Sequence, residues 1–140
     1  MGKKESILIV DDDEGTCKTL KLIFNRRGFE TETVNTGKEA LETLQKRYFN
    51  LIILDIILPD FDGIELLIHL KKLHPDAEAL MVTGYATVEK AIRALNEGAS
   101  AFITKPLNID EILSIINKVL EKQRLIVEKR KAEEALRELR

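Results

Sequence analysis

The sequence predicts an α/β fold, a five-stranded parallel sheet with helices on both faces. Three observations carry this prediction. Short apolar runs alternate with longer amphipathic stretches five times along the 140 residues. Two of the runs are continuous and rich in isoleucine, as expected of central strands that are buried on both faces. The longer stretches repeat their apolar residues at helical spacing, and strand–helix alternation is typical of parallel sheets.

The predicted strands are residues 7–10, 30–34, 51–54, 79–82 and 101–104. The first and third are the continuous apolar runs, which places them in the middle of the sheet. The second strand mixes Thr31 and Thr33 with acidic residues. This mixture favours a strand at the edge of the sheet, where one side meets water.

The predicted helices are residues 14–27, 37–46, 62–73, 87–97 and a last helix that starts near residue 109. Thr36 and Glu39 have the spacing of a capping box at the start of the second helix. Asn108 can cap the last helix. Gly98 follows the fourth helix, at the position where a left-handed residue commonly ends a helix.

The charge balance and the cysteine count exclude several classes of protein. The chain has 22 basic and 24 acidic residues, a formal net charge of -2, which argues against nucleic-acid binding through bulk positive charge. Its single cysteine, Cys17, excludes an intrachain disulfide and fits a cytoplasmic protein. No apolar run approaches the ~18–20 residues that a membrane span needs.

The last twenty residues differ in composition from the rest of the chain. Twelve of the residues from Glu121 to Arg140 are charged, and neither glycine nor proline occurs after Pro106. We therefore expect a globular domain of residues 5–122 and a helical extension of residues 123–140. Its apolar seam is too short to distinguish a coiled coil from a solvated single helix. The seam residues are Leu125, Ala132, Leu136 and Leu139.

Carboxylates follow two of the predicted strands. Asp11 and Asp12 follow the first strand, and Asp55 follows the third. Sites in such sheets form beyond the carboxyl ends of the strands, so these carboxylates converge if the two strands are neighbours. Like charges at close range are unfavourable, and a hard divalent cation relieves their repulsion. Oxygen ligands of this kind suit Mg²⁺.

Other polar residues near the strand ends have simpler interpretations. Asp13 lies nearest the first helix and is expected to be its N-cap. Asp60 and Asp62 follow Pro59 and are expected to be turn and cap residues. Lys105 follows the fifth strand; it is either solvated surface or the cation that neutralises an anion at this edge.

Taken together, these residues resemble a response-regulator receiver domain over residues 5–122. The resemblance rests on Val10-Asp11-Asp12, on Asp55 with Pro59 and Asp62-Gly63 after it, on Thr83, and on Lys105-Pro106, all in the family's order. The resemblance implies a flavodoxin-like sheet with strand order 2-1-3-4-5 and a cis peptide bond before Pro106.

The resemblance also implies a chemistry. Asp55 accepts a phosphoryl group from a phosphohistidine on a sensor histidine kinase or phosphotransfer protein. Mg²⁺, or Mn²⁺ in its place, binds Asp12 directly, Asp11 mainly through water, Asp55, and the backbone carbonyl of Ile57. Lys105 contacts a phosphoryl oxygen. The backbone N–H groups of Ile56 and Gly84 donate hydrogen bonds to the other phosphoryl oxygens.

The family pattern further implies a switch. The Thr83 hydroxyl moves to the phosphoryl group, and the Phe102 ring turns into the space it leaves. The surface of the fourth helix, fifth strand and fifth helix is then the readout face. The resemblance leaves room for a homodimer through this face or the C-terminal helix, and for an output domain beyond Arg140. It implies a signalling switch that catalyses only its own phosphorylation and dephosphorylation.

Three alternatives remain open at this point. A phosphohydrolase with an aspartate nucleophile also uses Mg²⁺, but it needs a second aspartate where this chain has Ile57. A nucleotide- or flavin-binding module needs a glycine-rich first turn, whereas this turn is acidic. A receiver-like interaction domain that is never phosphorylated usually lacks one of the acids or the lysine, and this chain has them all.

Overall fold

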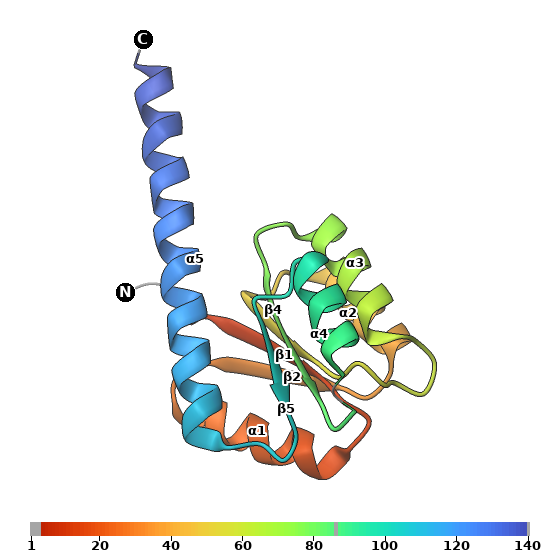
Figure 1. The fold of residues 1–140 in the computed structure, drawn as a ribbon. Helices are drawn as coiled ribbons and strands as arrows, with labels where there is room; N and C mark the ends of the chain where they lie inside the picture. Colours follow the sequence, from red (N-terminus) through yellow and green to blue (C-terminus); the bar gives the residue numbers. More distant parts are fainter. Residues whose placement is uncertain (1–3, 86, 140) are drawn as a thin grey trace. The chain divides into compact units, whose positions relative to one another are not determined.

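Five parallel strands form one sheet in the computed structural model, which describes residues 4–85 and 87–139 (Figure 1). The strands lie in the order β2-β1-β3-β4-β5, and each neighbouring pair is parallel. Their bounds are β1 (Ser6–Val10), β2 (Glu30–Val34), β3 (Leu51–Leu54), β4 (Glu78–Thr83) and β5 (Ala101–Thr104). The predicted fold class and strand order are therefore confirmed.

Four helices that alternate with the strands cover both faces of this sheet: α1 (Glu14–Arg26), α2 (Gly37–Lys46), α3 (Gly63–Leu73) and α4 (Val88–Asn96). A fifth helix, α5 (Ile109–Glu138), follows β5 in the chain. Figure 1 shows α2, α3 and α4 gathered on one face, with α1 on the other. The bounds of the first four helices lie within one residue of the predicted ones. α3 and α4 start one residue later than predicted, because Asp62 and Thr87 are N-caps rather than first helical residues.

The central strands are buried along their whole length. Every residue of β1 and of β3 is buried, as their continuous apolar runs predict. On the face of α2, α3 and α4, Leu8 packs in one apolar cluster with Leu44 and Leu67. A fully buried aliphatic side chain of this kind contributes about 1.5–3 kcal/mol. This packing fixes the strand ends that carry the polar residues.

The edge position predicted for β2 is confirmed. Only Thr31 and Val34 of its five residues are buried, and β2 is the first strand in the sheet order. Arg47 lies over this edge, with its guanidinium 3.0 Å from the Glu30 carboxylate and 3.4 Å from that of Glu32. Charged side chains on an exposed edge discourage pairing with another chain, whereas the ion pairs themselves add little stability.

The predicted helix ends also agree with the structure. The Thr36 hydroxyl accepts a hydrogen bond from the Glu39 N–H at 3.1 Å, and the Asn108 side chain accepts one from the Glu111 N–H at 3.1 Å. Gly98 has a φ of 104°, a left-handed conformation that favours glycine.

The described chain divides into two compact units, one ending at Leu107 and one starting at Asn108. The second unit is a single helix of 30 residues that continues without a break through residue 122. The predicted boundary between residues 122 and 123 therefore stays a prediction. Among helices in the described part of the chain, none is long and apolar enough to span a membrane.

Candidate functional site

Three carboxylates meet at the carboxyl ends of β1 and β3. The backbone hydrogen bonding of the sheet continues for one more residue at Asp11 and Asp55. The Asp11 N–H donates to the Val34 carbonyl, and the Asp55 N–H donates to the Val10 carbonyl. One carboxylate oxygen from each of Asp11, Asp12 and Asp55 lies within 4.8 Å of the others. Asp11 and Asp55 are buried, whereas Asp12 is exposed to water.

Lys105 joins this cluster from the end of β5. Its Nζ lies 2.8 Å from Asp11 Oδ2 and 2.9 Å from Asp55 Oδ2. Partial burial lowers the pKa of Lys105, but the hydrogen bonds to both carboxylates outweigh burial and raise it overall. The ammonium group therefore stays charged. Its peptide bond to Pro106 is cis, and its N–H donates to the Thr83 carbonyl.

The charges in this cluster fit a divalent cation. Three carboxylates face one ammonium group, so an excess of negative charge remains at a place where two of the carboxylates are buried. Both Asp11 oxygens are already engaged, Oδ2 with Lys105 and Oδ1 with the Asp13 N–H at 2.9 Å. Asp12 is the exposed acid of the three and is the more open to direct contact with a cation.

The acidic turn is held by two residues that the sequence analysis did not assign to the site. The Asp11 carbonyl accepts hydrogen bonds from Asn35 Nδ2 at 2.9 Å and from Cys17 Sγ at 3.3 Å. Burial raises the pKa of the Cys17 thiol to about 11, so the thiol keeps the proton that it donates. Asn35 follows the strand next to β1, and the strand-end rule could have identified it.

Asp13 caps α1, as the sequence predicted. Its carboxylate accepts hydrogen bonds from the Thr16 hydroxyl at 3.0 Å and from the Gly15 N–H at 2.9 Å. The bonds from Thr16, followed by that from Gly15, hold the pKa of Asp13 below its ordinary value. Asp13 therefore serves helix α1 rather than the carboxylate cluster.

The loop between β3 and α3 contributes a backbone group to Asp55. The Ile57 N–H donates to Asp55 Oδ1 at 3.1 Å, so both carboxylate oxygens of Asp55 have a donor. Ile56 is buried, and the Ile57 side chain is 44% exposed. Gly63 lies so close to this loop that a Cβ there would be 2.2 Å from the Asp55 carbonyl oxygen.

The interpretation of Asp60 as a turn residue is incomplete. Its carboxylate accepts hydrogen bonds from the N–H groups of Gly37 and Lys38, at 2.8 Å and 3.0 Å, at the start of α2. These bonds, first that from Gly37, lower the pKa of Asp60. Asp62 caps α3 as predicted, accepting from the Ile64 N–H at 2.8 Å.

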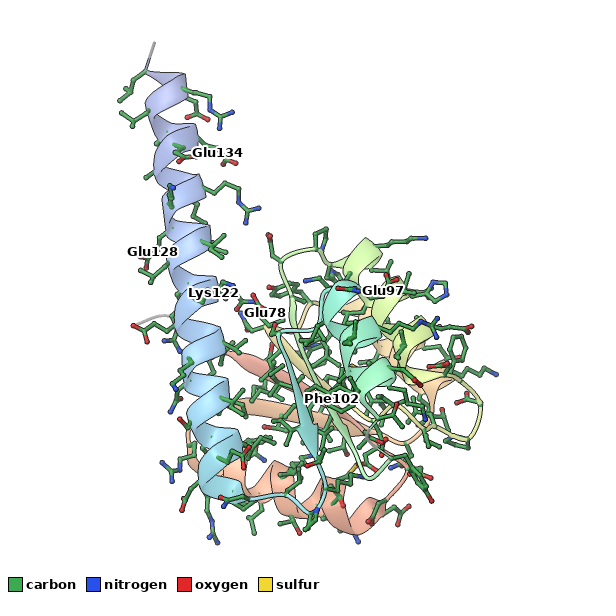
Figure 2. The ribbon with its side chains drawn as sticks, viewed as in Figure 1. Glu78, Glu97, Phe102, Lys122, Glu128 and Glu134 are labelled. Atoms are coloured by element: carbon green, nitrogen blue, oxygen red, sulfur yellow. The ribbon has the colours of Figure 1, made fainter. Side chains whose placement is uncertain are left out.

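The expected switch residues are Thr83, the last residue of β4, and Phe102, the second residue of β5. Thr83 is fully buried, and its hydroxyl accepts a hydrogen bond from the Tyr85 N–H at 3.2 Å. Phe102 lies on β5 and packs, half-buried, against the apolar cluster under α2, α3 and α4 (Figure 2). A Cβ on Gly84 would meet no atom of the described residues within 4 Å, its two chain neighbours aside.

Comparison with known proteins identifies the family. The model of the response regulator receiver domain matches residues 7–117 of the chain. The chain belongs to the response regulator receiver family. Such receiver domains are the signalling modules of two-component response regulators. The family favours the receiver interpretation over the phosphohydrolase and nucleotide-binding alternatives.

Individual relatives agree with the family match. The receiver domain is 35% identical over 120 residues to the transcriptional regulatory protein ZraR of Escherichia coli O157:H7, covering 86% of this chain and 27% of that protein. It thus spans about a quarter of that relative's length. A CheY-like receiver domain protein from Methanospirillum hungatei JF-1 has a TM-score of 0.85 and 41% identity, covering 87% of this chain and 98% of that one.

Proposed function

We propose that this receiver domain accepts a phosphoryl group on Asp55 from a phosphohistidine of a sensor histidine kinase or phosphotransfer protein. The observation that carries the proposal is the environment of the Asp55 carboxylate. It is buried, it is hydrogen-bonded to Lys105 and to the Ile57 N–H, and it lies among the carboxylates of Asp11 and Asp12.

In the proposed transfer, a carboxylate oxygen of Asp55 attacks phosphorus in line with the bond to the histidine nitrogen. The P–O bond forms as the P–N bond breaks, and the imidazole nitrogen keeps the electron pair and takes up a proton. Bound Mg²⁺, held by Asp12, Asp55, the Ile57 carbonyl and, through water, Asp11, would offset the negative charge on the phosphoryl oxygens. A carboxylate is a competent nucleophile once that repulsion is reduced.

The chain's own groups then hold the product. Lys105 moves its hydrogen bond from the carboxylate to a phosphoryl oxygen, where it acts as a point charge. The N–H groups of Ile56 and Gly84 donate hydrogen bonds to the other phosphoryl oxygens. Since the Thr83 hydroxyl already lies at this edge, bonded to the Tyr85 N–H, it can turn to the phosphoryl group. The Phe102 ring then moves into the space that Thr83 leaves.

The signal would leave the domain through α4, where three apolar side chains face water. Val88 is 75% exposed, Ile92 54% and Leu95 49%. We propose that this face, together with β5, docks an output domain or a second copy of the chain. A receiver domain from NtrC4, with a TM-score of 0.81 and 30% identity, covering 84% of this chain and 98% of that one, is described as a beryllofluoride-activated dimer. The C-terminal helix is a second candidate for dimer contacts.

The central test is the mass of the protein after incubation with acetyl phosphate and Mg²⁺. The wild type is expected to gain the mass of one phosphoryl group, and Asp55→Asn to gain none, because an amide is not a nucleophile toward phosphorus here. Asp13→Asn is the matched control, since it changes a nearby aspartate that caps α1. An adduct that persists in Asp55→Asn would reject Asp55 as the phosphoacceptor.

Metal binding should distinguish the two acids that follow β1. Asp12→Ala is expected to weaken Mg²⁺ binding more than Asp11→Ala. The exposed Asp12 is free for direct coordination, whereas both oxygens of Asp11 are already bonded within the protein. Calorimetric titration with MgCl₂ measures both affinities. Equal losses, or a larger loss in Asp11→Ala, would contradict this assignment.

The lifetime of the phosphorylated state should depend on Ile57 and Tyr85. Neither side chain offers an acid or amide that orients water for hydrolysis, and both are exposed beside the site, Tyr85 by 68%. The double variant Ile57→Asn, Tyr85→Glu is therefore expected to lose its phosphate about tenfold faster, which corresponds to ~1.4 kcal/mol of barrier. The decay is followed by mass after removal of the phosphodonor. An unchanged decay would mean that other groups control the access of water.

A further inference from the structure

The N–H groups in the first turn of α2 donate hydrogen bonds to side chains from two different parts of the chain. Its first N–H groups have no partner within the helix. Thr36, which precedes α2, accepts from the third of them, that of Glu39. The first two, those of Gly37 and Lys38, donate to Asp60, which lies 23 and 22 residues later in the loop between β3 and α3. Asp60 therefore links this loop to α2.

A second contact joins the same two segments. Gly37 packs against the ring and Cβ of Phe61, so closely that a Cβ on Gly37 would lie 2.5 Å from Phe61 Cβ. Phe61 also packs against the apolar cluster under α2, α3 and α4. The loop is thus held to α2 by an apolar contact and by two hydrogen bonds from adjacent residues.

Within the loop, the backbone connects Asp60 to Asp55. Ile57 and Asp62 pair as an antiparallel bridge on either side of Asp60. The Gly63 N–H donates to the Ile56 carbonyl at 2.7 Å. The Ile57 N–H in turn donates to Asp55 Oδ1 at 3.1 Å. A continuous set of short contacts therefore runs from the start of α2 to the carboxylate of Asp55.

We propose that Asp60 is a positioning residue for the phosphoacceptor: its carboxylate anchors the β3–α3 loop to α2 and so holds the Ile57 backbone against Asp55. This inference rests on the proposed function of Asp55. The hydrogen bonds from α2, Gly37 first, keep the pKa of Asp60 low, so its carboxylate is charged and can accept both bonds at neutral pH. A negative charge at the start of a helix is also favourable toward the helix dipole.

The anchor should matter most for the groups that Ile57 presents to the site. Its N–H orients the Asp55 carboxylate, and its carbonyl is the backbone ligand proposed for Mg²⁺. Partners that orient ligands typically change metal affinity or activity by about 10–100-fold when they are removed. Because Asp60 acts through the loop backbone, we expect a change near the lower end, about tenfold.

The test compares Asp60→Ala with Thr36→Ala. Both variants remove a side chain that caps α2, but only Asp60→Ala frees the β3–α3 loop. In the metal-free protein, amide hydrogen exchange at Ile57 is expected to be about tenfold faster in Asp60→Ala and unchanged in Thr36→Ala. With acetyl phosphate as donor, the Mg²⁺ concentration for half-maximal phosphorylation should rise about tenfold in Asp60→Ala only.

Asp60→Asn adds a graded control, because its amide oxygen can accept one of the two bonds, and it should fall between the wild type and Asp60→Ala. If Ile57 exchange and the Mg²⁺ requirement change equally in Asp60→Ala and Thr36→Ala, or in neither, Asp60 only caps α2 and the inference is wrong. If the wild type is not phosphorylated at all, the proposed function fails, while the exchange of Ile57 still decides whether Asp60 anchors the loop.

Discussion

Gly63→Ala is expected to destabilise the protein by about 3 kcal/mol, near the upper end of overpacking effects. The new Cβ would lie 2.2 Å from the Asp55 carbonyl oxygen and 2.6 Å from Ile56 Cα. Both are backbone atoms of a buried segment, so neither can turn aside as a flexible side chain would. The loop must move away from α3, which breaks the hydrogen bond from the Gly63 N–H to the Ile56 carbonyl. Phosphorylation should fall along with stability.

Thermal unfolding checks this prediction, and a loss of this size lowers Tm by roughly 10 °C in a chain of this length. Gly84→Ala is the matched control for stability, because a Cβ there would meet no atom within 4 Å in the part of the chain that the structure describes, its two neighbours aside. Its Tm should stay within a few degrees of the wild type. Equal Tm values for the wild type and Gly63→Ala would show that the loop can relax without cost.

Lys105→Ala is expected to lower the free energy of unfolding by about 2 kcal/mol in the absence of divalent ions. Removing one partner from a buried ion pair typically costs about 3–5 kcal/mol, and the cost is smaller here because a quarter of the lysine side chain faces water. The variant leaves the buried carboxylates of Asp11 and Asp55 without their shared cation. Adding Mg²⁺ should therefore restore stability more in this variant than in the wild type.

Urea unfolding with and without MgCl₂ measures both effects. Lys18→Ala, on the exposed surface of α1, is the control for loss of a lysine. The double variant Lys105→Ala, Asp11→Asn should regain part of the stability, because one of the two facing charges is gone. Lys105→Ala should also accept some phosphate without the conformational change in α4 and β5. Normal phosphorylation-dependent NMR shifts there would contradict the role of Lys105.

Local sequence patterns predicted most of the fold. The apolar runs of β1 and β3 required burial on both faces, and the polar residues of β2 required an edge. The N-caps Asp13, Thr36 and Asn108 were visible because each accepts from an N–H two or three residues ahead. The carboxylate cluster followed from one rule, that the carboxyl ends of parallel strands share an edge.

Other contacts of the site were not predicted from the sequence. Asp60 precedes α3 and looks like a turn residue, because the α2 amides that it binds are more than 20 residues earlier. The hydrogen bond from Asn35 to the Asp11 carbonyl joins residues 24 positions apart, and only the strand-end rule, applied to β2, could have indicated it. The need for glycine at position 63 is steric, since its φ is not left-handed, and no composition rule reports a distance to a neighbouring backbone.

The positions of Asp11, Asp55 and Lys105 along the chain also determine when the site comes together during folding. Lys105 contacts residues 94 and 50 positions earlier, across strands whose pairing closes long loops. Loop closure of this kind is entropically costly, so such contacts form slowly and late. A folding chain that has paired β1 with β3 but not yet added β5 brings two acids together before their lysine arrives. Water and dissolved cations must then screen the repulsion during that interval.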